Sequence, residues 1–155
     1  MGANSGLDGG AIFAFGVALV TNSTLTNTTA SNIGGGISAN DGNGVATAGT
    51  VANSTIANDV ATNSGGGISS NGAVVVTNST IANNTGAGLA NGAIDAGSGT
   101  GVTITNSTIA FDTAHDLGGV VFTNGSVVVT NSTLSSNTTS QDGGAIFAAS
   151  GVQLV

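Results

Sequence analysis

The tetrapeptide Asn-Ser-Thr-Ile or Asn-Ser-Thr-Leu occurs five times, at residues 22–25, 53–56, 78–81, 106–109 and 131–134. Successive copies are 31, 25, 28 and 25 residues apart. Between them lies a second signal, a glycine-rich turn followed by an aliphatic residue, which places in one column Ile12, Ile37, Ile68, Leu89, Val121 and Ile146. A period of about 27 residues is typical of solenoids, in which a repeat buries its apolar face only against its neighbours.

Apolar and polar residues alternate around each tetrapeptide. A β-branched residue stands two positions before every repeated Asn, and Ile or Leu stands three positions after it. This alternation predicts strands with one buried face, and the Asn-Ser-Thr between them predicts a polar corner. A further strand follows the glycines, where a tight turn needs residues without a side chain. The pattern therefore predicts three strands in each coil.

The sequence as a whole predicts an all-β fold, a right-handed parallel β-helix (β-solenoid) of about five to six coils. Right-handed winding is favoured because crossovers between parallel strands prefer that hand. Helices are disfavoured because 27 of the 155 residues are Gly and no helical apolar period is present. We expect residues 1–155 to form a single solenoid domain, open at both ends. It would be either a fragment of a longer array or a subunit that stacks on other copies.

Two sets of side chains are candidates for structural and binding roles. We expect the repeated asparagines to form an internal ladder, in which each amide bonds the coil above; these are Asn22, Asn53, Asn78, Asn106 and Asn131. On the strand after the glycines, Phe13, Phe122 and Phe147 share an outward column with Ser38, Ser69 and Ala90 between them. Exposed aromatic side chains at both ends of a stack predict a contact surface for another subunit or for glycans.

The longer coils carry insertions that we expect within residues 39–49 and 90–101, as polar loops on one edge. Their Asn and Asp side chains, at 40–43 and 91–95, are oxygen ligands of the kind that Ca²⁺ prefers. The regular acidic spacing of calcium-binding motifs is absent. Weak surface binding of Ca²⁺ is therefore the only cofactor interaction we consider, and we predict no dedicated metal or cofactor site.

Composition excludes several classes of function. The chain has no Lys, Arg, Glu or Cys, and its seven Asp give a formal net charge of −7. Without cations it cannot neutralise phosphates, so we expect no nucleic-acid partner and no binding to anionic membranes. The longest apolar run, residues 11–20, is too short to span a bilayer, so we expect no membrane insertion.

The repeat resembles a known family. Gly-Gly-Ala-Ile at 9–12 and 143–146, with Asn-Ser-Thr-Ile/Leu and an Asn or Asp three residues later (Asp59, Asn84, Asp112 and Asn137), resembles the polymorphic outer-membrane-protein repeat. That family uses Phe where this chain has Ile or Leu. The resemblance covers roughly Gly9 to Ile146, and it extends to the β-helix passengers of bacterial autotransporters and surface adhesins. It implies an extracellular or cell-surface location and a role as a stalk or adhesin.

We expect no enzymatic activity and no catalytic residues. The single histidine, His115, lies between Asp112 and Asp116, which we interpret as a polar turn rather than a general base or a metal site. Carbohydrate-active β-helices, which the fold also resembles, use Arg or Lys, or clustered Asp with cationic substrate clamps. This chain contains no such cation.

The preferred hypothesis is therefore a non-enzymatic extracellular structural or adhesive module that stacks end to end into filaments. Its expected partners are other copies of itself and a host-surface or glycan ligand. An alternative is an ice-binding solenoid, because threonines such as Thr103 and Thr105 point outward from one strand face. A third is a carbohydrate-binding or carbohydrate-active β-helix.

Overall fold

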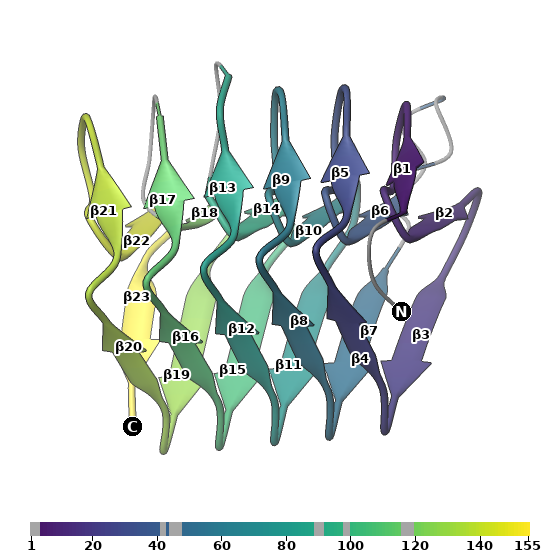
Figure 1. The fold of residues 1–155 in the computed structure, drawn as a ribbon. Helices are drawn as coiled ribbons and strands as arrows, with labels where there is room; N and C mark the ends of the chain where they lie inside the picture. The colour runs from purple at the N-terminus through teal and green to yellow at the C-terminus, as the bar shows by residue number, and fades with distance from the viewer. Residues whose placement is uncertain (1–3, 41–42, 44–47, 89–91, 98–99, 116–119) are drawn as a thin grey trace.

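The computed structural model describes residues 4–40, 43, 48–88, 92–97, 100–115 and 120–155. These residues form a parallel β-solenoid whose coils stack side by side, as Figure 1 shows, so the predicted fold class is confirmed. Among them there is no helix, and hence none that is long and apolar enough to cross a membrane.

Four parallel sheets run along the solenoid. Sheet I holds the strands after the glycines: β2 (Ile12–Ala14), β6 (Ile37–Ala39), β10 (Ile68–Ser70), β14 (Ile94–Ala96), β18 (Val121–Thr123) and β22 (Ile146–Ala148). Sheet II holds the strands before the repeated Asn: β3 (Ala18–Thr21), β7 (Gly49–Ala52), β11 (Val74–Thr77), β15 (Val102–Thr105), β19 (Val127–Thr130) and β23 (Val152–Leu154).

The other two sheets follow the Asn-Ser-Thr corner. Sheet III consists of β4 (Thr24–Thr26), β8 (Thr55–Ala57), β12 (Thr80–Ala82), β16 (Thr108–Ala110) and β20 (Thr133–Ser135). Sheet IV consists of β1 (Ser5–Gly6), β5 (Thr29–Ala30), β9 (Val60–Ala61), β13 (Thr85–Gly86), β17 (Thr113–Ala114) and β21 (Thr138–Thr139). Sheet IV adds a fourth strand to each coil, beyond the three strands that the sequence predicts. Its strands are two residues long, too short to produce a visible alternation in the sequence.

One member of the predicted aliphatic column is wrong. The register pairs Ile68 with Ile94 and Ile94 with Val121, so Ile94 takes the position expected for Leu89. Leu89 itself lies outside the described residues. This coil contains two glycine-rich signals, and strand β14 follows the one that contains Gly92.

This shift in register moves Asp95 out of the predicted loop. Asp95 lies within β14 and pairs with Ser69 and Phe122, so it occupies the place in the phenylalanine column that was expected for Ala90. Ala90 and Asp41 lie outside the described residues. The expected insertion at 90–101 is therefore shorter than predicted, because part of it is strand.

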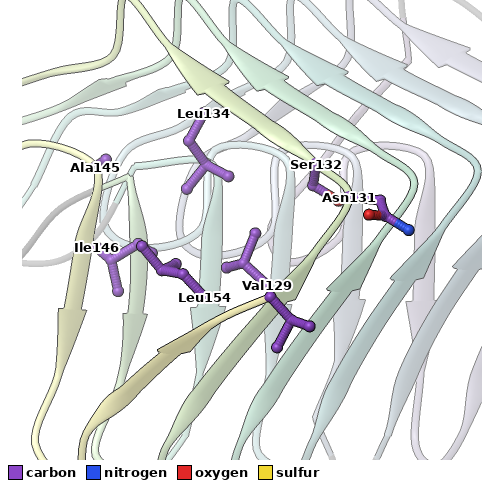
Figure 2. A pocket seen from close by; sticks show the side chains of 8 residues that line it. Val129, Asn131, Ser132, Leu134, Ala145, Ile146 and Leu154 are labelled. Atoms are coloured by element: carbon purple, nitrogen blue, oxygen red, sulfur yellow. The ribbon is translucent and has the colours of Figure 1, made fainter.

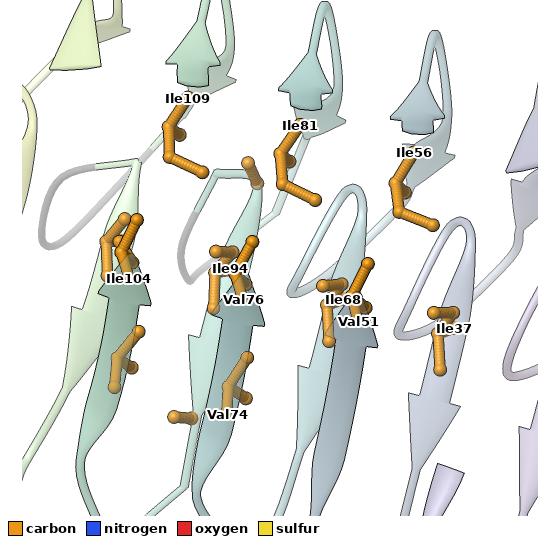
Figure 3. Close-up of a cluster of buried hydrophobic side chains, with 14 of the residues drawn as sticks. Ile37, Val51, Ile56, Ile68, Val74, Val76, Ile81, Ile94, Ile104 and Ile109 are labelled. Atoms are coloured by element: carbon orange, nitrogen blue, oxygen red, sulfur yellow. The ribbon is translucent and has the colours of Figure 1, made fainter. Parts of the chain in front are cut away.

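The core consists of aliphatic columns that face one another across the coil (Figure 3). Ile37, Ile68 and Ile94 point inward from sheet I, and Ile56 and Ile81 point inward from sheet III, all of them fully buried. Burying each such side chain stabilises the fold by roughly 1.5–3 kcal/mol. The columns run without a break because each coil repeats the same register.

Each residue of the Asn-Ser-Thr-Ile tetrapeptide has its own structural role. The Ser is the buried polar member: Ser79 Oγ accepts the backbone N–H of Ser54 at 3.0 Å and donates to the carbonyl of Thr77 at 2.7 Å. The same bonds link Ser23, Ser54, Ser107 and Ser132 into one ladder. The Ile of the tetrapeptide points into the core, and the Thr points out.

The predicted internal asparagine ladder is wrong. Asn22, Asn53, Asn78, Asn106 and Asn131 are all exposed, with φ between 47° and 50°. This left-handed conformation costs most residues energy, and Asn tolerates it better than other residues with a side chain. The repeated Asn is therefore selected by the corner's backbone. Its side chains do bond along the outside, from Asn78 Nδ2 to Asn53 Oδ1 at 3.2 Å and from Asn106 Nδ2 to Asn78 Oδ1 at 3.3 Å.

The internal polar ladder lies at the next corner, between sheets III and IV. Its members are Thr28, Asp59, Asn84, Asp112 and Asn137. The Oδ1 atom of each Asp or Asn accepts the backbone N–H of the equivalent residue one coil earlier, at 2.7–3.0 Å. The ladder thereby satisfies the backbone groups that turn inward at this corner.

The hydrogen bonding of the two aspartic acids in this ladder is incomplete. The Oδ2 atoms of Asp59 and Asp112 are buried and have no hydrogen-bond partner. In the coil between them, Asn84 uses its Nδ2 to donate to the carbonyl of Ile56 at 3.1 Å. A Cβ atom on Gly36 would lie 3.0 Å from Asp59 Oδ2, and one on Gly67 would lie 3.3 Å from Asn84 Nδ2, so the two atoms occupy equivalent places. A hydrogen-bond donor fits this position, as Asn84 Nδ2 does in its coil, so the position favours the protonated form of the aspartic acid.

The burial of these carboxyl groups raises the pKa of Asp59 to about 6 and that of Asp112 to about 7. The hydrogen bonds from Thr28 and Asn84 lower these pKa values and offset burial only in part. In the unfolded chain both groups titrate near 3.8. Between about pH 4 and 7 the folded state therefore binds more protons than the unfolded state, so stability falls as the pH rises.

We predict that the protein is more stable in mild acid than at pH 8. Each acid contributes about 1.4 kcal/mol for every pH unit over which only the folded state is protonated. The urea midpoint should therefore be highest near pH 4 and fall as the pH rises through 6 to 7. Chemical denaturation followed by circular dichroism across pH 4–8 measures it.

The double variant D59N/D112N should remove most of this dependence and raise the midpoint at pH 8, because the amide supplies the donor that Asn84 already supplies. D142N, at an exposed position, is the matched control and should retain the wild-type profile. A midpoint that rises with pH in the wild type would contradict this account.

Candidate binding surface

An unbroken column of threonines covers the outer face of sheet III. Its members are Thr24, Thr55, Thr80, Thr108 and Thr133. Each is paired in register with the next, so their hydroxyl and methyl groups repeat at the inter-strand spacing of roughly 4.8 Å. All five are exposed or half-buried, whereas the Ile or Leu that follows each of them points into the core.

The outer asparagine column runs beside the threonine column, two residues earlier in each coil. It consists of the five left-handed asparagines of the first corner. The bonds between Asn53, Asn78 and Asn106 orient neighbouring amides the same way along the solenoid. We call the two columns together the threonine–asparagine face. The paired strands of sheets II and III hold the two columns in place, and one serine separates them in each coil.

The threonine–asparagine face contains no charged residue. Two of the seven aspartates, Asp59 and Asp112, are buried in the internal ladder, and Asp95 lies on sheet I. The face therefore presents only hydroxyl, methyl and amide groups. Such groups can exchange hydrogen bonds with an uncharged hydroxylated surface and have no means of binding an anion by charge.

The phenylalanines predicted as a contact surface lie in one register column on sheet I, as expected. The rings of Phe122 and Phe147 stack at 5.2 Å between centroids and 9° between planes. Phe13 contacts Phe15 edge to face at 4.8 Å. Ser38, Ser69 and Asp95 separate Phe13 from the other two. The column therefore forms two aromatic pairs at opposite ends rather than one continuous aromatic surface.

In the part of the chain that the structure describes, Asp112 and His115 do not form a common polar site. Asp112 is buried in the internal ladder, whereas His115 is exposed. Asp116 lies outside the described residues, as do Asp41 and Asn91 of the loops considered for Ca²⁺. Among the residues that the structure describes, no group of three or more His, Cys, Asp or Glu side chains comes together.

The threonine column is the functional candidate that the sequence analysis missed. The signal was present, because Thr occupies the third position of all five tetrapeptides. In the sequence it is indistinguishable from the polar residues of a corner, and the alternation points to outward threonines on sheet II instead. There the outward positions vary, as in Leu19, Thr50 and Val75, so that face is less regular.

No family model matches this chain, and no curated protein and no solved structure is significantly similar to it.

We predict that the stability of the protein depends little on the outer asparagine Asn78 and strongly on the inner asparagine Asn84. Asn78→Gly should change the free energy of unfolding by at most about 0.5 kcal/mol, because glycine adopts the left-handed conformation freely and the two amide bonds that are lost are exposed. Asn84→Ala should cost on the order of 1–3 kcal/mol, because it leaves buried ladder groups without partners. Urea denaturation of both variants checks this. A larger loss for Asn78→Gly than for Asn84→Ala would show that the outer column holds the coils together.

Proposed function

We propose that this chain is a structural and adhesive β-solenoid module of an extracellular or cell-surface protein. The observation that carries the proposal is the threonine–asparagine face, in which the same uncharged groups recur in every coil. A repeating row of weak contacts suits a repeating ligand, because avidity multiplies contacts that are individually weak. Its repeat signatures, which resemble those of polymorphic outer-membrane proteins and autotransporter passengers, support the same role.

The chemistry of the face favours a neutral glycan as the ligand. Threonine hydroxyls and asparagine amides both donate and accept hydrogen bonds, as sugar hydroxyls do. The net charge of −7 disfavours polyanionic ligands. Catalysis is no part of the proposal.

We predict that the protein is retained on insoluble neutral polysaccharides such as cellulose or chitin, and that the triple variant T55V/T80V/T108V is not. Valine keeps the shape and the strand preference of threonine and removes only the hydroxyl group. The control T29V/T85V/T138V makes the same change in the outward column of sheet IV, which already contains Val60. Equal retention of the two triple variants would contradict the role of the face.

Ice binding is the second candidate, and the unbroken threonine column is what favours it. A flat row of hydroxyl and methyl groups at fixed spacing is a template for ordered water. The same protein samples separate the two candidates through thermal hysteresis. Hysteresis in the wild type that is lost in T55V/T80V/T108V, without retention on polysaccharide, would favour ice as the ligand.

End-to-end association is the other part of the proposed structural role. Figure 2 shows a hollow at one end of the solenoid, lined by Val129, Leu134, Ile146 and Leu154 among others. A second hollow at the other end is lined by Ile12, Val20 and Leu25, which belong to the same columns. A copy placed on either end would continue the core columns. This contact is head to tail and therefore extends into a filament.

We predict that the purified chain self-associates and that Leu154→Asp blocks association. Leu154 is 73% exposed, so the substitution leaves the monomer's core intact while it places a charge on the end face. Salt should favour association by screening the −7 charge. Sedimentation velocity at low and high salt measures it, with D142N as a surface control. A wild type that stays monomeric at high concentration and high salt would refute end-to-end stacking.

A further inference from the structure

Phe111 is the one bulky residue at the second corner. The corner position before the internal ladder has φ between 55° and 59° in every coil. Asn27, Asn58 and Asn83 occupy it in the first three coils, and Ser136 in the last. A left-handed conformation is uncommon for any residue with a Cβ and is a genuine outlier for a bulky one. Phenylalanine at φ 59° is therefore the least suited residue in the column.

Burial of the Phe111 side chain does not offset this strain. Its side chain is 61% exposed, so most of the ring contributes nothing to the core. Its backbone N–H donates to the carbonyl of Ser135 at 3.2 Å, the same bond that Asn83 makes to Ala110 in the coil before. Asparagine would make this bond with less strain. Strained residues that packing does not explain concentrate at functional sites.

Phe111 is also set apart from the other aromatic side chains. The chain has five phenylalanines, and the other four form the two pairs on sheet I and its adjoining corner. Phe111 lies between β16 and β17, at the opposite edge of sheet III from the outer asparagine column. It thus places a single apolar ring at the corner that follows sheet III, three residues after Thr108.

We propose that Phe111 is the aromatic platform of a saccharide-binding site on this corner. The C–H face of a sugar ring packs on an aromatic ring, while its hydroxyl groups need uncharged donors and acceptors. Asn83 and Ser136 flank Phe111 in the neighbouring coils, and the outward threonines Thr108 and Thr113 lie three residues before it and two after it. The aromatic ring supplies apolar contact area, and the neighbouring hydroxyl and amide groups supply uncharged hydrogen-bond donors and acceptors.

The ligand class follows from the charge of the surroundings. The chain has no Lys or Arg, which removes the groups that would bind a sulfated or phosphorylated sugar or a nucleic acid. The carboxyl group of the adjacent Asp112 is turned into the internal ladder, so it offers no exposed charge to a cationic ligand. A neutral saccharide is the class that remains. The inference rests on the proposed adhesive function and assigns to it a specific site.

The decisive variant is Phe111→Asn, which installs the residue that this column uses elsewhere. It should raise the urea midpoint, because strain is relieved, and lower the affinity for neutral oligosaccharides about tenfold or more. Affinity is measured by isothermal calorimetry with cello- and chito-oligosaccharides. Phe111→Tyr should retain binding, because it keeps the aromatic face. Phe122→Ser, which introduces the residue type of Ser38 and Ser69, tests the competing expectation that the phenylalanine column of sheet I contacts glycans, and should leave affinity unchanged.

A gain in stability together with a loss of affinity distinguishes a binding role from a structural one. Unchanged affinity in Phe111→Asn, or a loss in Phe122→Ser alone, would overturn the inference. Retention of Phe111→Asn on polysaccharide with loss of T55V/T80V/T108V would overturn it while the proposed function stands. A wild type that binds neither the oligosaccharides nor the polysaccharides would overturn both.

Discussion

The structure depends on one constraint: every coil must turn at the same places by the same angle, or the parallel strands lose register. The chain meets it with two left-handed non-glycine residues in each full coil, one on either side of sheet III. Eight of the ten non-glycine residues with positive φ are asparagines. Asparagine is the side-chain-bearing residue that adopts this conformation most readily, which accounts for its frequency here better than any hydrogen bond it makes.

Once the corners are fixed, the interior follows from stacking. Identical registers bring Ile over Ile and Val over Val, so that the core is continuous from coil to coil. The same stacking brings polar residues together inside, where the serine ladder and the ladder through Asp59, Asn84 and Asp112 bond the backbone of successive coils. Two acids within a column otherwise filled by neutral residues make the interior sensitive to protons.

The sequence was sufficient for the fold and insufficient for the placement of its polar side chains. Periodicity predicted the parallel solenoid and the inward columns, because burial of one strand face imposes a strict alternation of apolar and polar residues. It failed at Ile94, where two glycine signals lie close together, and at sheet IV, where the strands are too short to alternate. It also placed Asn78 inside and overlooked Thr80, because a repeated polar residue looks the same whether a ladder or a backbone angle selects it.

The serine ladder also bears on how this protein ages. An asparagine deamidates when the backbone nitrogen of the next residue attacks its side-chain carbonyl carbon, and flexible Asn-Ser sequences are prone to this reaction. Here the nitrogens that follow Asn22, Asn53, Asn78 and Asn106 each donate to a serine hydroxyl of the adjacent coil. The attacking atom is thus held in place and the backbone around it is fixed. These four exposed asparagines are thereby shielded from deamidation for as long as the coils stay stacked.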